Sequence, residues 1–301
     1  MTAAPRLLAE PRCIWDAGAS LGEGTCWSER EQALYWVDIL GKQLHRCQAD
    51  GSARRSWHFD ETISAVAERA SHTGLAVTLR RGLALFDPAS LSLKRLHEPE
   101  PERENNRFND GKCDRAGHFW GGTMDFDCQA PSGALYRFDA SGHAVRAADL
   151  QWPVTNGPTW SHDGRTLFLN ETVGGCVHAF DVIEPARGDL GPPRLWLRFA
   201  EGDGVPDGMT TDAAGRIWIA HWGGSCVTCH DGETARELLR VPLPASQITN
   251  VAFGGPDLTT VFVTSARVGL GKAQLATEPL AGALFAFETD ALGLAPTPYA
   301  G

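Results

Sequence analysis

A pattern that recurs six times along the chain is the strongest constraint on its fold. Each copy has a polar segment, a short apolar strand, a turn rich in Asp and Gly, and a second strand that is apolar and often aromatic. The clear copies are DGKCDRAGHFWGGTM from Asp110, NGPTWSHDGRTLFLNETVGG from Asn156 and DGMTTDAAGRIWIAHWGG from Asp207. Weaker copies begin at Leu21, Ile63 and Thr249. Such a repeat predicts an array or ring of similar units.

The spacing of the copies identifies the unit. One equivalent position in each second strand is occupied in turn by Trp36, Val77, Trp120, Phe168, Trp218 and Phe262, at separations of 41, 43, 48, 50 and 44 residues. These separations are typical of propeller blades, and the copies alternate apolar and polar residues as strands do. No long apolar stripe of helical period is present, so a helical array is excluded.

The sequence therefore predicts an all-β fold, a six-bladed β-propeller of four-stranded antiparallel blades in a single domain over residues 1–301. The repeats lie near 14–60, 61–103, 104–150, 151–200, 201–245 and 246–296. Residues 282–290 are expected to form an outer strand of the last blade. Trp36, Trp120 and Trp218 are expected to pack blade against blade.

The repeat register also locates a candidate site. The innermost strand of each blade lines the central channel, so equivalent residues at its entrance converge. Counting back 11 to 13 residues from the aligned positions gives Glu23, Ser64, Asn109, Asn156, Asp207 and Asn250. Asn-Gly and Asp-Gly pairs are also ordinary turn formers. Their shared register at one channel mouth nevertheless favours a site.

Two carboxylates surrounded by carboxamide oxygens repel each other unless a cation lies between them. The sequence therefore predicts one divalent cation at the mouth. Oxygen ligands suit Ca²⁺, Mg²⁺ or Mn²⁺, while Fe²⁺ and Zn²⁺ remain open. Arg107 and Asn109 precede the third inner strand, where a guanidinium suits an oxygen-rich anionic or polyhydroxy substrate. The alternative is a surface arginine packed on Phe108.

Composition excludes several classes of protein. Lys plus Arg number 27 and Asp plus Glu 37, a formal charge of −10, and no basic run exceeds two residues, which argues against nucleic-acid binding. No segment approaches the roughly 20 apolar residues of a membrane span, and the N-terminus has no signal-peptide core, so a cytoplasmic protein is expected. Serine-hydrolase, H-E-x-x-H and nucleotide-binding motifs are missing.

The eight cysteines are expected to be reduced thiols. Residues 226–230, CVTCH, match the C-x-x-C-H form of a c-type haem attachment site. The segment alternates like a strand, however, and lies between two glycine-containing turns. We therefore expect a strand here rather than a haem site.

Eight ordered segments resemble one known family: LGEGTCW, YWVDI, NNRFNDGKCD, GHFWGGTM, GALYRFD, TNGPTWSHDG, PDGMTTDAAGRIWIAHWGG and FGGPDLTTVFVTSAR. This is the gluconolactonase, senescence-marker-protein (regucalcin) and luciferin-regenerating-enzyme family, and the chain is especially similar to bacterial sugar-acid lactonases. The resemblance spans about residues 14–290. It implies a six-bladed propeller with one divalent cation held by Glu23, Asn156 and Asp207.

The resemblance further implies that Arg107 and Asn109 bind the oxygens of a lactone. A family Glu that contacts substrate shortly after the G-T-M motif is matched most nearly by Asp127, which has a shorter side chain. Where relatives often carry Asp after the second strand of the fourth blade, this chain has Asn170 and Glu171, and neither is expected to be a ligand.

The expected activity is metal-dependent hydrolysis of an aldonolactone, such as glucono-, xylono- or arabinono-lactone, to the free acid in sugar oxidation. Asp207 would be both ligand and candidate general base, and the protein would act as a monomer. One alternative is a non-catalytic propeller that binds proteins. Another is a paraoxonase-like esterase, which prefers an apolar mouth and is disfavoured by Arg107 and Asn109. Trp222 and His221 are candidates for the rim, outside the assigned site.

Overall fold

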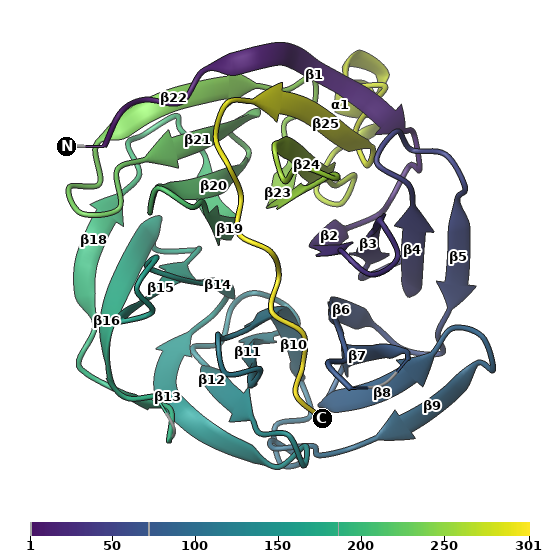
Figure 1. Cartoon of the computed structure of the whole chain (residues 1–301), viewed down its shortest axis with the longest axis vertical. Helices are drawn as coiled ribbons and strands as arrows, with labels where there is room; N and C mark the ends of the chain where they lie inside the picture. Colours follow the sequence, from purple (N-terminus) through teal and green to yellow (C-terminus); the bar gives the residue numbers. More distant parts are fainter. Residues whose placement is uncertain (1, 72, 186) are drawn as a thin grey trace.

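The repeated strand pairs form six antiparallel sheets around a central channel in the computed structural model (Figure 1). The structure describes residues 2–71, 73–185 and 187–301. In each sheet, one strand lines the channel and the others follow outward, so the fold is an all-β six-bladed propeller. The predicted fold class is confirmed.

The first three blades each contain four consecutive strands. The first blade is β2 (Gly22–Ser28), β3 (Ala33–Asp38), β4 (Gln43–Cys47) and β5 (Arg55–His58). The second is β6 (Ile63–Glu68), β7 (Leu75–Leu79), β8 (Leu83–Asp87) and β9 (Ser92–Arg95). The third is β10 (Asn106–Cys113), β11 (Phe119–Asp125), β12 (Gly133–Phe138) and β13 (Ala144–Trp152).

The fourth blade carries one short strand more than expected. It consists of β14 (Thr155–Trp160), β15 (Thr166–Glu171), β16 (Cys176–Glu184), the two-residue β17 (Asp189–Leu190) and β18 (Arg194–Arg198). Both β17 and β18 pair with the long strand β16. The fifth blade is β19 (Val205–Thr211), β20 (Ile217–Trp222), β21 (Cys226–His230) and β22 (Glu237–Pro242).

The sixth blade joins the two ends of the chain. It contains β23 (Ile248–Gly254), β24 (Thr260–Ser265), β25 (Leu284–Thr289) and β1 (Leu7–Trp15), with helix α1 (Lys272–Thr277) between β24 and β25. Segment 282–290 thus holds the third strand, and β1 takes the outermost place. The repeat expected from residue 14 overlaps the end of β1, which belongs to the sixth blade rather than the first.

Aromatic side chains fill the spaces between neighbouring blades. Trp36, Trp120 and Trp218 are fully buried in clusters that join two blades each, as expected. Trp218 of the fifth blade meets Phe253 of the sixth edge to face, with ring centroids 5.4 Å apart. Burial of these large aromatic side chains between the sheets holds the six blades together around the channel.

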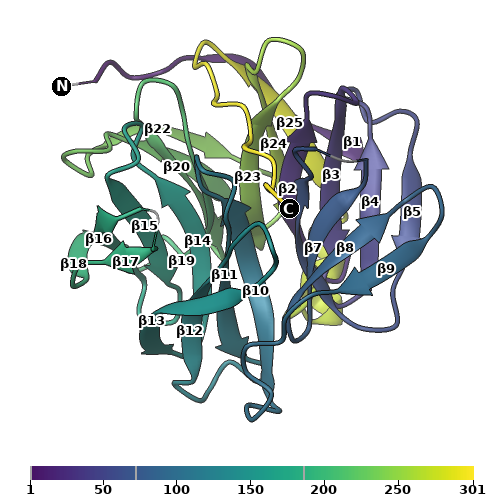
Figure 2. The same cartoon turned by 60° about the horizontal axis from the view of Figure 1, so that its bottom comes forward.

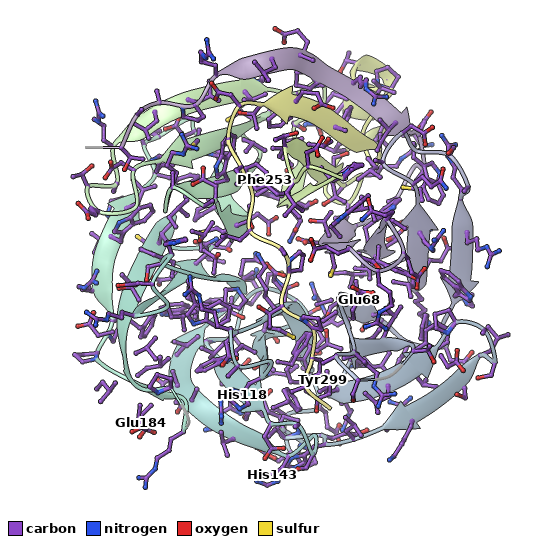
Figure 3. The ribbon with its side chains drawn as sticks, viewed as in Figure 1. Glu68, His118, His143, Glu184, Phe253 and Tyr299 are labelled. Atoms are coloured by element: carbon purple, nitrogen blue, oxygen red, sulfur yellow. The ribbon has the colours of Figure 1, made fainter. Side chains whose placement is uncertain are left out.

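The C-terminal residues 291–301, here called the strap, cross one end of the channel (Figure 1). Near one end of the strap, Gly293 packs against Phe253, and near the other, Tyr299 donates its backbone N–H to the carbonyl of Glu68. Phe253, Tyr299 and Glu68 are labelled in Figure 3. The Tyr299 hydroxyl is buried and donates to the carbonyl of Asp139 at 2.6 Å. Strap residues 294–297 line a small cavity of about 120 Å³ at this end.

The cysteine and membrane expectations can also be compared with the structure. The CVTCH segment forms β21, as expected, and all eight cysteines lie within the described residues as free thiols. Among the described residues, no helix has the length and apolar character needed to cross a bilayer.

Candidate functional site

A break in strand register near one end of every inner strand builds the site (Figure 2 gives a second view of these strands). The pairing of β2 with β3 shifts between Glu23 and Cys26, and that of β14 with β15 shifts between Asn156 and Thr159. The pairing of β19 with β20 shifts between Pro206 and Met209. A β-bulge re-aims the local side chains and commonly lies beside functional sites.

Glycines after the polar residues permit this close packing. Gly24 follows Glu23 with a φ of 59°, and a Cβ there would approach the Ser64 carbonyl to 2.9 Å. Gly208 follows Asp207, and a Cβ there would lie 2.3 Å from the Asn250 amide. The Glu-Gly and Asp-Gly pairs therefore bring neighbouring inner strands together, as well as turning the chain.

Six of the eight site residues predicted from the sequence line one cavity of about 490 Å³ at this end of the channel, whereas Ser64 and Asn250, which the register also selected, are not among its lining residues. The six are Glu23, Arg107, Asn109, Asp127, Asn156 and Asp207. They come from the first, third, fourth and fifth blades. Strand ends far apart in the sequence are thus brought together.

Three buried carboxylates, Glu23, Asp110 and Asp207, lie near one another. Burial raises the pKa of Glu23 well above its usual range, and the charges of Asp207 and Asp110 raise it further. The pKa of Asp207 is raised well above normal, first by burial and then by Asp110. Burial likewise raises the pKa of Asp110 to about 7. Ionising all of these groups together requires positive charge beside them.

Sequence reasoning missed Asp110. The pairing of β10 shifts between Phe108 and Gly111, so Asn109 and Asp110 both lie in the irregular segment. The Asp110 carboxylate accepts hydrogen bonds from the N–H of Gly111 at 2.8 Å and from the Asn250 amide at 3.5 Å. The motif NNRFNDGK contained the signal, but strict alternation would place only one of the two residues toward the channel.

A hydrogen-bonded row of side chains joins the third, fourth and fifth blades. Arg107 donates to the Asn109 carboxamide oxygen at 2.7 Å, and Asn109 donates to that of Asn156 at 2.6 Å. Asn156 donates to the Thr172 hydroxyl at 3.0 Å, which donates to the Pro206 carbonyl at 2.9 Å. Thr172, which sequence reasoning also missed, therefore fixes the orientation of the Asn156 amide, whose oxygen accepts from Asn109.

The arginine in this row is buried, and burial lowers its pKa to about 10. Phe126, at the rim, lies within 5.8 Å of the Arg107 guanidinium and 5.5 Å of the Arg80 guanidinium, measured to the ring centroid. Asp127 is exposed at the cavity edge and accepts a hydrogen bond from Asn105 at 3.0 Å. Its carboxylate can thus meet a ligand only at the outer part of the cavity.

The two rim candidates, Trp222 and His221, differ in their position relative to the cavity. Trp222 lines the cavity, whereas His221 is buried beside β21 and does not belong to the lining residues. The His221 ring forms hydrogen bonds with the Asp203 carbonyl at 2.8 Å and the Thr228 hydroxyl at 2.6 Å. Burial lowers its pKa to about 4. These contacts indicate that His221 has a structural role in the fifth blade.

The donor set fits an oxygen-preferring divalent cation. The Oδ1 atom of Asp207 is buried and has no hydrogen-bond partner among the described residues. Asn170 donates its amide to the Asp207 backbone carbonyl, which holds the aspartate in place from behind. Three buried carboxylates lie near the cations Arg107 and Lys112, and a bound divalent cation would supply the further positive charge that lets all three ionise.

A second group of potential metal ligands lies on the fourth blade. Glu171 and Cys176 are direct partners on β15 and β16, and His178 follows on the same face. Their ligand atoms lie within 4.8 Å of one another, with His178 Nε2 and Glu171 joined at 2.9 Å. Glu171 thus belongs to a cluster beside the cavity and does not line it.

The cavity wall is more apolar than the sequence indicated. Besides the polar residues, the lining includes Leu21, Leu40, Met124, Phe126, Val154, Val173, Val205, Trp222 and Val268. Arg107 and Asn109 therefore do not make the mouth polar, and the argument from them against an esterase that prefers an apolar mouth is wrong. The apolar surface comes from strand-end residues such as Met124, Val205 and Trp222 and from residues of the connecting loops.

The fold and site together define a six-bladed propeller with a buried acidic centre at one channel end. The chain matches the family model "SMP-30/Gluconolactonase/LRE-like region" over residues 21–267. It is 36% identical over 288 residues to L-arabinolactonase of Azospirillum brasilense, covering 95% of this chain and 94% of that protein. It is 35% identical to 6-deoxy-6-sulfogluconolactonase of Pseudomonas putida, covering 96% and 98%.

Among solved structures, the calcium-binding protein regucalcin of Agrobacterium tumefaciens superposes with a TM-score of 0.90. It is 26% identical and covers 99% of each chain. The protein therefore belongs to the SMP-30, gluconolactonase and luciferin-regenerating-enzyme family, and the resemblance found in the sequence is confirmed.

Proposed function

We propose that the protein is a divalent-metal-dependent lactonase that hydrolyses a sugar-acid lactone to the free acid. The observation that carries the proposal is the buried Oδ1 atom of Asp207, which has no hydrogen-bond partner in the described part of the chain and lies in the cavity that Glu23 and Asn156 also line. Oxygens of these three side chains would hold the cation, which is Ca²⁺, Mn²⁺, Mg²⁺, Fe²⁺ or Zn²⁺. The lactonase names of relatives that match nearly the whole chain support the reaction class.

A bound cation supplies Lewis-acid polarisation of the lactone carbonyl and lowers the pKa of water. The side chains supply orientation and proton transfer. Both amide hydrogens of Asn109 are donated to Thr155 and Asn156, so Asn109 would orient Arg107 through its oxygen. Arg107 would donate hydrogen bonds to the oxygens on one edge of the substrate, and Asp127 would accept one from a hydroxyl at the outer edge. Asp207 would take the proton from the attacking water, a role that requires it to be ionised.

The test is hydrolysis of a panel of aldono-1,4- and 1,5-lactones, followed by proton release, with protein that has been stripped by chelator and reloaded with single metals. Asp207→Ala measures the contribution of the site, and Asp163→Ala, a change to an exposed carboxylate in the loop between β14 and β15, is the matched control. We expect turnover well above the Asp207→Ala rate for wild type and the control alike. Equal rates for wild type and Asp207→Ala would overturn the proposal.

The rival protein-binding platform gives a different result in the same samples. A platform would show no turnover with any metal, and its stability would not depend on the site residues through a bound cation. We also propose a cytoplasmic monomer. Light scattering after size-exclusion chromatography tests the monomer, and an oligomeric mass would contradict it.

A further inference from the structure

We propose that the lactone preferred by this pocket is amphipathic, with polar groups on the edge that meets Arg107 and Asn109 and an alkyl or aryl substituent against the apolar walls. This inference rests on the proposed lactonase function and, in place of the fully hydroxylated sugar-acid lactone, assigns to it a lactone that also carries an apolar substituent. It differs from a preference for lactones with hydroxyls around the whole ring.

The polar and apolar parts of the cavity are spatially separate. Glu23, Asn156 and Asp207 stand on inner strands, at the register shifts described above. The apolar lining residues form two groups by blade: Leu21, Leu40, Trp222 and Val268 from the first, fifth and sixth blades, and Met124, Phe126, Val154 and Val173 from the third and fourth. A ligand that contacts the polar side chains must therefore place its remaining surface against the apolar side chains.

The first apolar wall is part of the packed interior. Leu21 is buried in the cluster between the first two blades, and Leu40, Trp222 and Val268 pack against the same cluster. These side chains are therefore held in place by the core behind them. A fixed apolar wall favours apolar ligand groups without first having to order itself.

The opposite wall keeps apolar surface in contact with water. Val173 is 58% exposed and Phe126 is 36% exposed, and both stand at the rim of the cavity. The Phe126 ring is flanked by the guanidinium groups of Arg80 and Arg107. A substituent that covers these two side chains removes apolar surface from water, and each methylene so buried favours binding about fourfold.

The volume and the hydrogen-bonding capacity of the cavity agree with this division. Its volume of about 490 Å³ suits ligands larger than an aldonolactone of about a dozen non-hydrogen atoms. Both amide hydrogens of Asn109 are donated to Thr155 and Asn156, so the donors left for substrate hydroxyls in this row are those of Arg107 that do not bond to Phe108 or Asn109. A hydroxyl turned toward Val154 or Leu40 would lose its water without gaining a partner.

The experiment compares kcat/KM for γ-lactones with alkyl substituents of increasing length against aldono-1,4-lactones, using metal-loaded wild type. We expect kcat/KM to rise by at least about tenfold from γ-valerolactone to γ-nonalactone, and to exceed that of the best aldonolactone. Val173→Thr keeps the shape of the side chain and adds a hydroxyl. It should lower the preference for the long chain by about threefold or more, while Val145→Thr on β13, outside the cavity, should not.

Three outcomes separate this inference from the lactonase proposal. If aldonolactones are hydrolysed better than every alkyl lactone, the amphipathic preference is wrong and the lactonase proposal stands. If Val173→Thr keeps the wild-type preference for long alkyl chains, the apolar wall does not cause that preference and the inference is overturned. If no lactone is hydrolysed, calorimetry with alkyl-substituted cyclopentanones, which cannot be hydrolysed, decides: chain-length-dependent binding supports the apolar wall, and length-independent binding overturns it.

Discussion

At the scale of single residues, the buried carboxylates at the centre of the channel are the charged groups least balanced by positive charge nearby. In the metal-free protein, Asp207 is buried beside Asp110 and Glu23, and its raised pKa means that the ionised form costs folding free energy above its unfolded pKa. Asp207→Asn should therefore raise the metal-free stability at pH 8 by about 1 kcal/mol or more. Urea unfolding in the presence of chelator measures it.

The same variant should lose the stabilisation that added metal gives the wild type, because a ligand that binds only the folded state stabilises it in proportion to its affinity. Asp163→Ala should keep that stabilisation. If Asp207→Asn were stabilised by metal as strongly as the wild type, Asp207 would not be a ligand.

Buried histidines predict sensitivity to acid. His45 packs 4.2 Å from the Trp36 ring, measured between centroids, and burial lowers its pKa from 6.5 to about 4. Its neutral form contributes stability above pH 6.5 that is lost as the pH falls toward 4, since only the unfolded chain takes up the proton readily in that interval. His45→Gln should thus reduce the loss of stability between pH 7 and pH 4.5. Unfolding free energies at the two pH values measure this, and an unchanged difference would contradict it.

Much of the site could be predicted at this scale because the repeat supplies a register. Glu23, Asn109, Asn156 and Asp207 occupy equivalent positions, and the structure places them around one cavity. Asp110 and the rim valine Val173 could not be found in this way. Asp110 depends on a bulge that strict alternation does not reveal, and Val173 lies in a turn whose direction is set by tertiary packing.

At the scale of strands, the bulges make the inner strands both close-packed and intolerant of side chains. Gly24→Ala would force a φ of 59° on an alanine and place its Cβ 2.9 Å from the Ser64 carbonyl. We expect a loss of about 2 kcal/mol or more of stability.

Gly175→Ala is the matched control, because Gly175 has a φ of 63° and a Cβ there would meet no described heavy atom within 4 Å. It should cost only the conformational strain, roughly 1 kcal/mol. Chemical unfolding of the two variants gives the difference. Equal losses would mean that the approach of β2 to β6 imposes no steric limit at Gly24.

The strand pattern itself was largely predictable, because apolar alternation and Asp-Gly turns recur in every blade. The closure of the ring of blades was less predictable. β1 pairs with β25 from the other end of the chain, from Leu7 opposite Thr289 to Trp15 opposite Leu284. Local sequence carries no record of a partner more than 250 residues away, so the place of residues 282–290 within the blade was not fixed by pattern alone.

At the scale of the whole molecule, the strap joins the sixth blade, where Gly293 packs against Phe253, to the second and third blades, which are not its neighbours in the ring. Tyr299 is fully buried among residues of the second and third blades. Tyr299→Ala should cost roughly 3 kcal/mol, as large core truncations do. Tyr299→Phe, which removes only the hydroxyl that bonds to Asp139, should cost about 1 kcal/mol. Urea unfolding measures both, and a fully stable alanine variant would show that the strap does not hold the ring.

The strap also lies beside the smaller of two cavities in the channel, about 120 Å³ against about 490 Å³ at the acidic centre. Its residues 294–297 lie across the end away from the acidic centre, beside Lys112 and Thr159 on the inner strands. In the proposed reaction, the acid product would therefore leave through the same cavity that admits the lactone, and the two would compete for it. We expect the product acid to inhibit competitively, raising KM without changing kcat, and purely noncompetitive inhibition in initial-rate kinetics would point to product binding at a second site.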